Sequence, residues 1–124
     1  MKKVIHQRKF HLLIIIILTT LVYANIFQNQ FVQDDFEFIQ NWELIRSLES
    51  IPNFFAGATK EGHTGVYRPI ARTLLTIYYN LWGTNTLGYH LANLFFHVLS
   101  TLVIYLLAEA VSRKRSIAFA ASLL

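Results

Sequence analysis

The chain has 124 residues, of which 54% are hydrophobic and 15% charged, with a formal net charge of +4 and no cysteine. So low a share of charge, against about 25% in a typical soluble domain, argues against an ordinary soluble domain, and the lack of cysteine excludes disulfide frameworks, thiol catalysis and thiolate metal sites. Seven of the eleven Lys and Arg residues flank apolar segments, where cations orient membrane spans, so we expect an all-α membrane protein with no nucleic-acid partner.

The first predicted element is a transmembrane helix over residues 10–27, an uncharged stretch as long as a bilayer requires. A basic N-terminus over residues 1–9 precedes it and is predicted to be cytoplasmic. Its cations are Lys2, Lys3, Arg8 and Lys9. A cleaved signal peptide is the alternative, because a basic start, an apolar stretch and the sequence Val22-Tyr23-Ala24 resemble its three regions.

The next segment, residues 28–90, is predicted to be an exported, ordered loop, and it holds six of the seven acidic residues. Its first expected helix runs from Asp34 to Ile51, with Asp34 as the N-cap and Glu37 three residues later. Apolar residues then recur at helical spacing, at Phe38, Trp42, Ile45 and Leu48. We expect this amphipathic helix to lie in the membrane interface or on top of a helix bundle.

A second interfacial helix is expected to begin at Pro69 and to end at Gly83, because proline favours the first helical position and glycine the position after the last. Its apolar stripe consists of Ile70, Leu74, Ile77, Tyr78 and Leu81. The connection between the two helices, residues 53–67, holds three of the five glycines and is predicted to be flexible.

The second transmembrane helix is predicted over residues 91–111, and a cytoplasmic turn over residues 112–116 follows it. The positive-inside rule places this turn and the N-terminus on the same side, with Glu109 expected to pair with Arg113 four residues later. Residues 117–124 resemble the start of a third transmembrane helix. We therefore expect the N-terminal piece of a larger multi-pass protein of the plasma membrane.

Two neighbouring carboxylates, Asp34 and Asp35, are candidates for chemistry because they follow the outer end of the first span. Such a pair can act as a general base or as ligands for a divalent metal, and the structural alternative is a helix cap with a solvated neighbour. Arg68 and Arg72 stand at the start of the second loop helix, where guanidinium groups and free N–H groups favour a phosphate. The alternatives for the arginines are lipid headgroups or ion pairs with Glu43 or Glu49.

A polar face is predicted on the second span, where His90, Asn93 and His97 are spaced i, i+3 and i+7. Polar groups in a span face protein rather than lipid, so this face indicates either a proton or substrate path or hydrogen bonding between helices. The two histidines are two turns apart with no acidic neighbour and do not form a metal site by themselves.

The order of these features resembles the start of the GT-C membrane glycosyltransferases, in the protein O-mannosyltransferase-like branch that includes proteins with TPR repeats. The strings that carry the resemblance are Asp34-Asp35, Tyr67-Arg68-Pro69, Trp82-Gly83-Thr84-Asn85, and Gly88-Tyr89-His90 with Asn93 and His97. The chain departs from the family pattern at Thr86, where relatives often have proline.

The resemblance implies transfer of a sugar from a polyprenyl-phosphate donor to a hydroxyl acceptor, on a protein, lipid or glycan, on the exported side of the bilayer. Asp34 or Asp35 would then be the catalytic base, and Arg68, with Arg72, would hold the donor phosphate. Members of the family differ over whether a metal, such as Mg²⁺ or Mn²⁺, joins the acidic pair. The 124-residue piece alone is expected to be inactive; the alternatives are a small non-catalytic accessory subunit and a fragment of a transporter.

Overall fold

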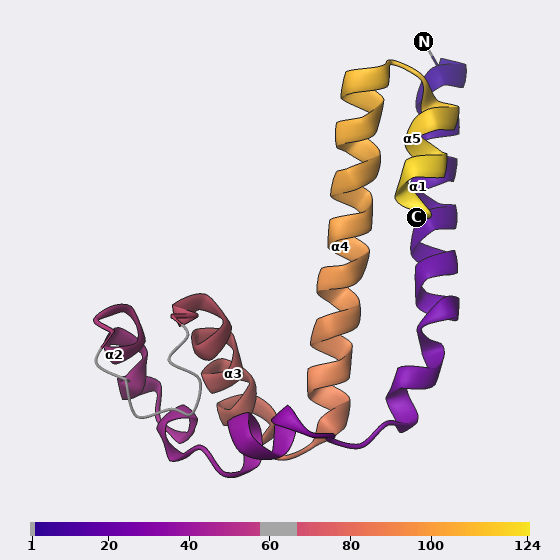
Figure 1. Cartoon of the computed structure of the whole chain (residues 1–124). Helices are drawn as coiled ribbons and strands as arrows, with labels where there is room; N and C mark the ends of the chain where they lie inside the picture. The colour runs from indigo at the N-terminus through magenta and orange to yellow at the C-terminus, as the bar shows by residue number, and fades with distance from the viewer. Residues whose placement is uncertain (1, 58–66) are drawn as a thin grey trace. The chain divides into compact units, whose positions relative to one another are not determined.

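The computed structural model describes residues 2–57 and 67–124, and all of the regular structure in these two ranges is helical (Figure 1). The α-helices are α1 (Lys2–Val22), α2 (Ile51–Phe55), α3 (Pro69–Trp82), α4 (Thr86–Ser112) and α5 (Arg115–Ser122). Short 3₁₀ or π turns lie at Ala24–Gln28, Phe36–Gln40, Glu43–Arg46 and Leu48–Ser50. The expected all-α class is confirmed for the described residues, and residues 58–66 of the predicted flexible connection lie outside them.

In the described part of the chain, two helices are long and apolar enough to cross a membrane, Gln7–Gln28 and Thr86–Ser112. In the most apolar 18-residue stretch of each helix, only 11% of the first and 17% of the second is buried. A core helix of a soluble protein would be covered by its neighbours, whereas a helix that faces lipid exposes its apolar side chains. The low burial therefore supports a membrane protein.

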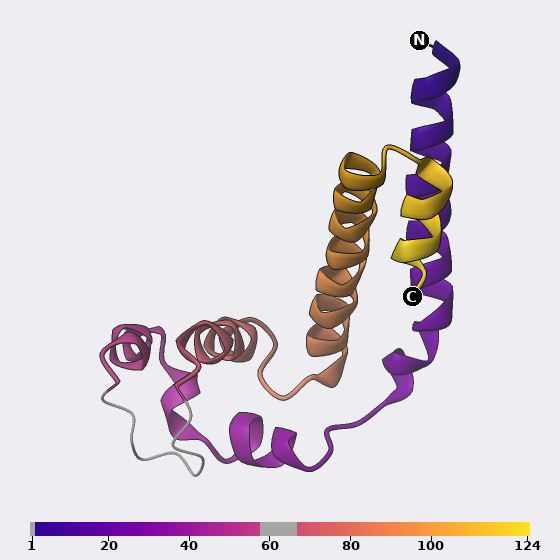
Figure 2. The same cartoon turned by 45° about the horizontal axis from the view of Figure 1, so that its top comes forward.

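The chain divides into two compact units. The first, here called the apolar unit, combines the chain up to Gln28 with His90–Leu124. In it α5 lies alongside α1 in both views (Figures 1 and 2). Its buried cluster takes one residue from each of three helices, Ile15 of α1, Tyr105 of α4 and Ala118 of α5. This cluster joins the three helices because it removes apolar surface from solvent between them.

The second unit, Asn29–Tyr89, is here called the aromatic unit. Its buried cluster consists of Phe31, Ile39, Ile45 and Tyr89. The Phe31 and Tyr89 rings meet edge to face with centroids 5.3 Å apart, a favourable geometry for aromatic pairs. Tyr78 of α3 packs against the same cluster, and burial raises the pKa of its phenol.

The predicted continuous helix from Asp34 to Ile51 is wrong. The chain instead forms the π turn Phe36–Gln40 and two 3₁₀ turns, interrupted by extended backbone at Trp42 and Ser47. The apolar periodicity was misleading because Ile39 and Ile45 reach the buried cluster from separate turns, while Leu48 is 52% exposed. The Ser47 hydroxyl accepts the Glu49 N–H at 3.2 Å, a local bond that competes with a continuous helix.

The predicted helix between Pro69 and Gly83 is confirmed: α3 begins at Pro69, and Gly83 follows its last residue with a positive φ of 58°. Glycine tolerates this left-handed conformation, which ends the helix. The face that packs into the unit includes Tyr78 of the apolar stripe expected in the sequence, but otherwise differs from that stripe. Thr76 is fully buried, and Leu75 packs against the buried cluster of the aromatic unit. Three residues of the expected stripe are exposed, namely Ile70, Ile77 and Leu81.

Gly88 provides a test of this packing, because a methyl group at that position would overlap the Trp82 ring. In an ordinary helix Gly→Ala stabilises by about 1 kcal/mol, but overpacking costs about 1–3 kcal/mol. We expect Gly88→Ala to lower the free energy of unfolding by about 1 kcal/mol, measured by denaturation in detergent. In a Trp82→Ala background the overlap is absent, so the same substitution should be neutral or stabilising; equal losses in both backgrounds would contradict the packing.

Candidate functional site

The acidic pair lies in a tight turn at the start of the aromatic unit. The Asp35 N–H donates to the Val32 carbonyl at 3.0 Å, and the Val32 N–H donates to Oδ2 of Asp35 at 3.1 Å. These reciprocal bonds hold the half-buried Asp35 side chain against its own turn. Asp34 is exposed, and its carboxylate makes no hydrogen bond or ion pair within the described parts of the chain. The two carboxylates are therefore not equivalent: Asp35 shapes the turn and Asp34 is open to a ligand.

The two arginines also differ in their surroundings. Arg72 of α3 is half-buried, and its guanidinium carbon lies 5.0 Å from the centroid of the Trp42 ring. This is cation–π distance, so the contact orients the Arg72 side chain. Arg68 lies just before Pro69 with an exposed side chain, and its carbonyl accepts the Arg72 N–H at 3.1 Å.

The alternative role of the two arginines, ion pairs with Glu43 or Glu49, is not seen in the described part of the structure. Neither Glu43 nor Glu49 forms an ion pair within the described residues. The nearby Arg46 instead donates to the Gln40 carbonyl at 3.1 Å and lies 6.0 Å from the Tyr79 ring.

Trp42 connects the part of the unit that carries the acidic pair with the part that carries the arginines. It packs against the cluster that contains Ile39, four residues after Asp35, and it contacts Arg72 on α3. Its ring also lies 5.7 Å from that of Phe54 in α2. The sequence indicated Trp42 as a member of an apolar stripe and, with Asn41, as part of the family resemblance, but not as a partner of Arg72. Its contact with Arg72 joins residues thirty positions apart, so no local pattern could indicate it.

A metal site receives little support from the ligand set. Within residues 7–57 and 67–124 no group of three or more His, Cys, Asp or Glu residues is placed to hold a metal ion. Mg²⁺ often binds through one or two carboxylates and completes its shell with water and substrate phosphate, which is the most that Asp34 and Asp35 offer.

Of the residues of the predicted polar face, His97 lines a cavity that does not include the other two. The His97 ring meets that of Tyr23 edge to face, with centroids 4.5 Å apart. Both line a cavity of about 310 Å³ in the apolar unit, together with the hydroxyl residues Thr19, Thr101 and Ser122. Asn93 and the half-buried His90 do not line it. The sequence did not indicate Tyr23 as a partner of His97, because the two belong to helices far apart in the chain.

Comparison with known proteins gives one informative match. The chain is 32% identical to a protein O-mannosyl-transferase of Caenorhabditis elegans over an alignment of 124 positions. The match covers 92% of this chain, and the chain spans 18% of the length of that relative. No family model and no solved structure matches the chain. The similarity indicates a distant relation to a glycosyltransferase.

Proposed function

We propose that this chain forms part of an integral-membrane glycosyltransferase of the GT-C type, which transfers a sugar, mannose in the first instance, from a polyprenyl-phosphate donor to a hydroxyl acceptor on the exported side. The observation that carries the proposal is the 32% identity to an O-mannosyl-transferase over 92% of the chain. A match of that extent includes both apolar helices and the segment between them with its acidic turn.

Asp34 is the proposed general base. Its exposed carboxylate takes the proton of the acceptor hydroxyl as the oxygen attacks the anomeric carbon of the sugar. The bond between that carbon and the phosphate oxygen breaks, and the polyprenyl phosphate leaves with the bonding electrons. Asp35 is less suited to this step because one of its oxygens already accepts the Val32 N–H. Its proposed role is to position Asp34 by holding the turn.

Arg68 is the proposed partner of the departing phosphate. Its exposed guanidinium precedes the first turn of α3, where backbone N–H groups without helical partners also favour an anion. A planar guanidinium can offer two parallel N–H donors to phosphate oxygens. Arg72 contributes positive charge one turn later, and its contact with Trp42 also makes it part of the packing of the aromatic unit.

The exposed stripe on α3 supports a place for this helix at the membrane surface. Ile70 is 70% exposed and Leu81 is 66% exposed, with Ile77 between them on the same face. An apolar stripe on a helix with a packed opposite face is suited to the boundary between headgroups and acyl chains. We propose this interfacial location for α3, because it would place Arg68 at the depth of a lipid-linked phosphate.

The proposal is tested with the protein in its native membrane and polyprenyl-phosphate mannose labelled in the sugar. We expect label to appear on a hydroxyl acceptor, and membranes without the protein provide the background. Polyprenyl-phosphate glucose and a nucleotide-linked mannose serve as alternative donors. Transfer from the nucleotide-linked sugar alone would contradict the donor class. No transfer from any of the three would favour the accessory-subunit or transporter alternatives.

A further inference from the structure

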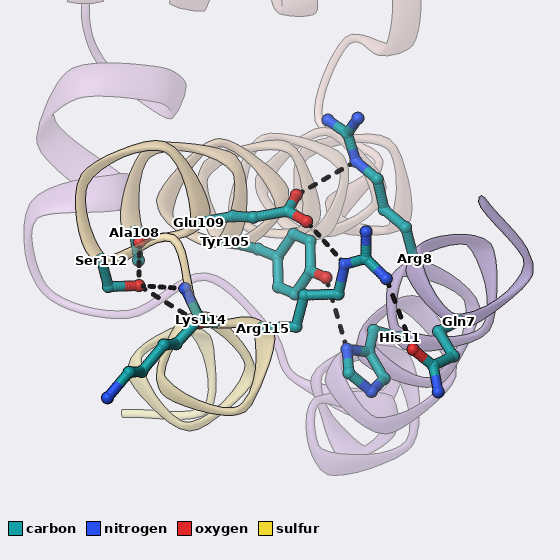
Figure 3. A network of polar contacts seen from close by, with 9 residues as sticks. All are labelled: Gln7, Arg8, His11, Tyr105, Ala108, Glu109, Ser112, Lys114 and Arg115. Carbon is teal, nitrogen blue, oxygen red and sulfur yellow. Dashed lines mark hydrogen bonds and ion pairs between the residues drawn. The ribbon is translucent and has the colours of Figure 1, made fainter. Parts of the chain in front are cut away.

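A cluster of charged residues joins three helices at one end of the apolar unit (Figure 3). Oε1 of Glu109 in α4 lies 2.9 Å from Nε of Arg115 in α5, and its Oε2 lies 3.2 Å from Nε of Arg8 in α1. The expected pairing of Glu109 with Arg113 is therefore wrong. Arg113 has a left-handed φ of 55° where α4 ends, so its side chain does not continue the helical face of Glu109.

The cluster is built into the packing between the helices. The Glu109 side chain is only 19% exposed, and the neighbouring Tyr105 is fully buried with its hydroxyl 3.3 Å from Nδ1 of His11. Nη1 of Arg115 donates to Oε1 of Gln7 at 3.4 Å. Both arginines are thus held by partners from other helices, and their side chains stay accessible to a ligand, with 49% of Arg8 and 25% of Arg115 exposed.

The charges of this cluster do not balance. One carboxylate faces two guanidinium groups, each of which has five N–H donors. Within the described residues Arg8 uses only its Nε–H, and Arg115 uses its Nε–H and one terminal nitrogen. Figure 3 shows the outer nitrogens of Arg8 pointing away from the carboxylate, and one terminal nitrogen of Arg115 without a drawn contact. Several donors with net positive charge remain for an anion.

We propose that Arg8 and Arg115, held together by Glu109, bind the phosphate group of an anionic phospholipid. The cluster lies where α1 and α4, the two helices apolar enough to cross a membrane, carry their charged ends, and headgroup phosphates occupy that depth in a bilayer. Guanidinium groups suit this ligand because they offer paired donors in a fixed plane. Free inorganic phosphate has the same chemistry and is separated from the lipid by the test.

The test uses the protein in nanodiscs of phosphatidylcholine with 10–20% phosphatidylglycerol, roughly the anionic range at which surface binding is appreciable, and measures retained lipid by native mass spectrometry. We expect Arg8→Gln and Arg115→Gln each to lower retention of phosphatidylglycerol about tenfold, the loss of one charge-assisted pair. Lys9→Gln and Lys114→Gln remove the same charge at the same end and are the matched controls. The Lys114 ammonium points away from the cluster in Figure 3. Equal losses in all four variants would overturn the proposal.

Glu109→Gln separates a built site from a diffuse basic surface. The variant adds one unit of positive charge, so a diffuse surface would retain more anionic lipid. A built site would retain less, because the two guanidinium groups lose the carboxylate that positions them. We expect Glu109→Gln to retain less phosphatidylglycerol than the unmodified protein, and an increase in retained lipid would overturn the proposal. If the variant does not assemble, Arg8→Lys with Arg115→Lys keeps the charge and loses the planar donors, and unchanged retention there would overturn it equally.

Inorganic phosphate distinguishes the two sources of the anion. Added at millimolar concentration, on the order of weak single-anion affinities, it is expected to leave the retained phosphatidylglycerol in place, since the lipid is also held by its chains in the bilayer. Complete displacement by phosphate would assign the cluster to a soluble anion and overturn the lipid proposal.

Discussion

Replacing Asp34 with Asn is expected to abolish sugar transfer and to leave insertion and folding unchanged. The substitution keeps the shape of an exposed side chain and removes its ability to accept a proton. Loss of a positioned general base lowers a rate by about 10²–10⁴-fold. The measurement is the initial rate of label transfer from polyprenyl-phosphate mannose, normalised to the amount of protein in the membrane.

The neighbouring carboxylate supplies an internal comparison. In Asp35→Asn the amide oxygen can still accept the Val32 N–H, so the turn is kept and the rate should fall by less than about tenfold. The double substitution of Asp34 and Asp35 should behave as the Asp34 variant does. Glu43→Gln changes the same charge at an exposed position of the same unit and should leave the rate unaltered. If Asp34→Asn retains more than half of the activity, Asp34 is not the base.

The elements that could be read from the sequence are those with local signals. Pro69 and Gly83 act on the backbone at their own positions, and α3 accordingly has the expected ends. The two apolar stretches are equally local, because the length of an uninterrupted apolar run is itself the signal for a possible span. The segment after Asp34 lacked such signals, and its apolar spacing fitted both a continuous helix and separate turns around one cluster.

The contacts that organise the two candidate sites are not local. Arg72 lies over Trp42 across thirty positions, and Glu109 joins Arg8 of α1 to Arg115 of α5. The predicted ion pair of Glu109 with Arg113, four residues later, assumed that the helix continues through Arg113, but the backbone turns there. Residue types and charge could therefore indicate candidate groups, whereas the partner of each group depends on how the helices pack.

Arg68→Lys is expected to weaken use of the donor more than Arg72→Lys does. Lysine keeps the positive charge and loses the planar pair of donors that fits a phosphate, so the apparent KM for polyprenyl-phosphate mannose should rise about tenfold or more at Arg68. Arg72 is engaged with Trp42, so Arg72→Lys should act first on stability, with a loss of about 0.5–1 kcal/mol from the weaker ring contact.

The comparison of the two variants separates a role in binding the donor from a role in the packing of the aromatic unit. In thermal unfolding in detergent, Arg68→Lys should have the same Tm as the unmodified protein, and Arg72→Lys should have a lower Tm. The reason is that the Arg68 side chain is exposed and the Arg72 side chain is half-buried. The kinetic order should be the reverse, with the larger rise in KM at Arg68. An unchanged KM in Arg68→Lys would remove this residue from the phosphate site. Equal effects of both variants on KM and unfolding would instead mean that the two arginines serve one structural contact, and the phosphate would then have to be held elsewhere.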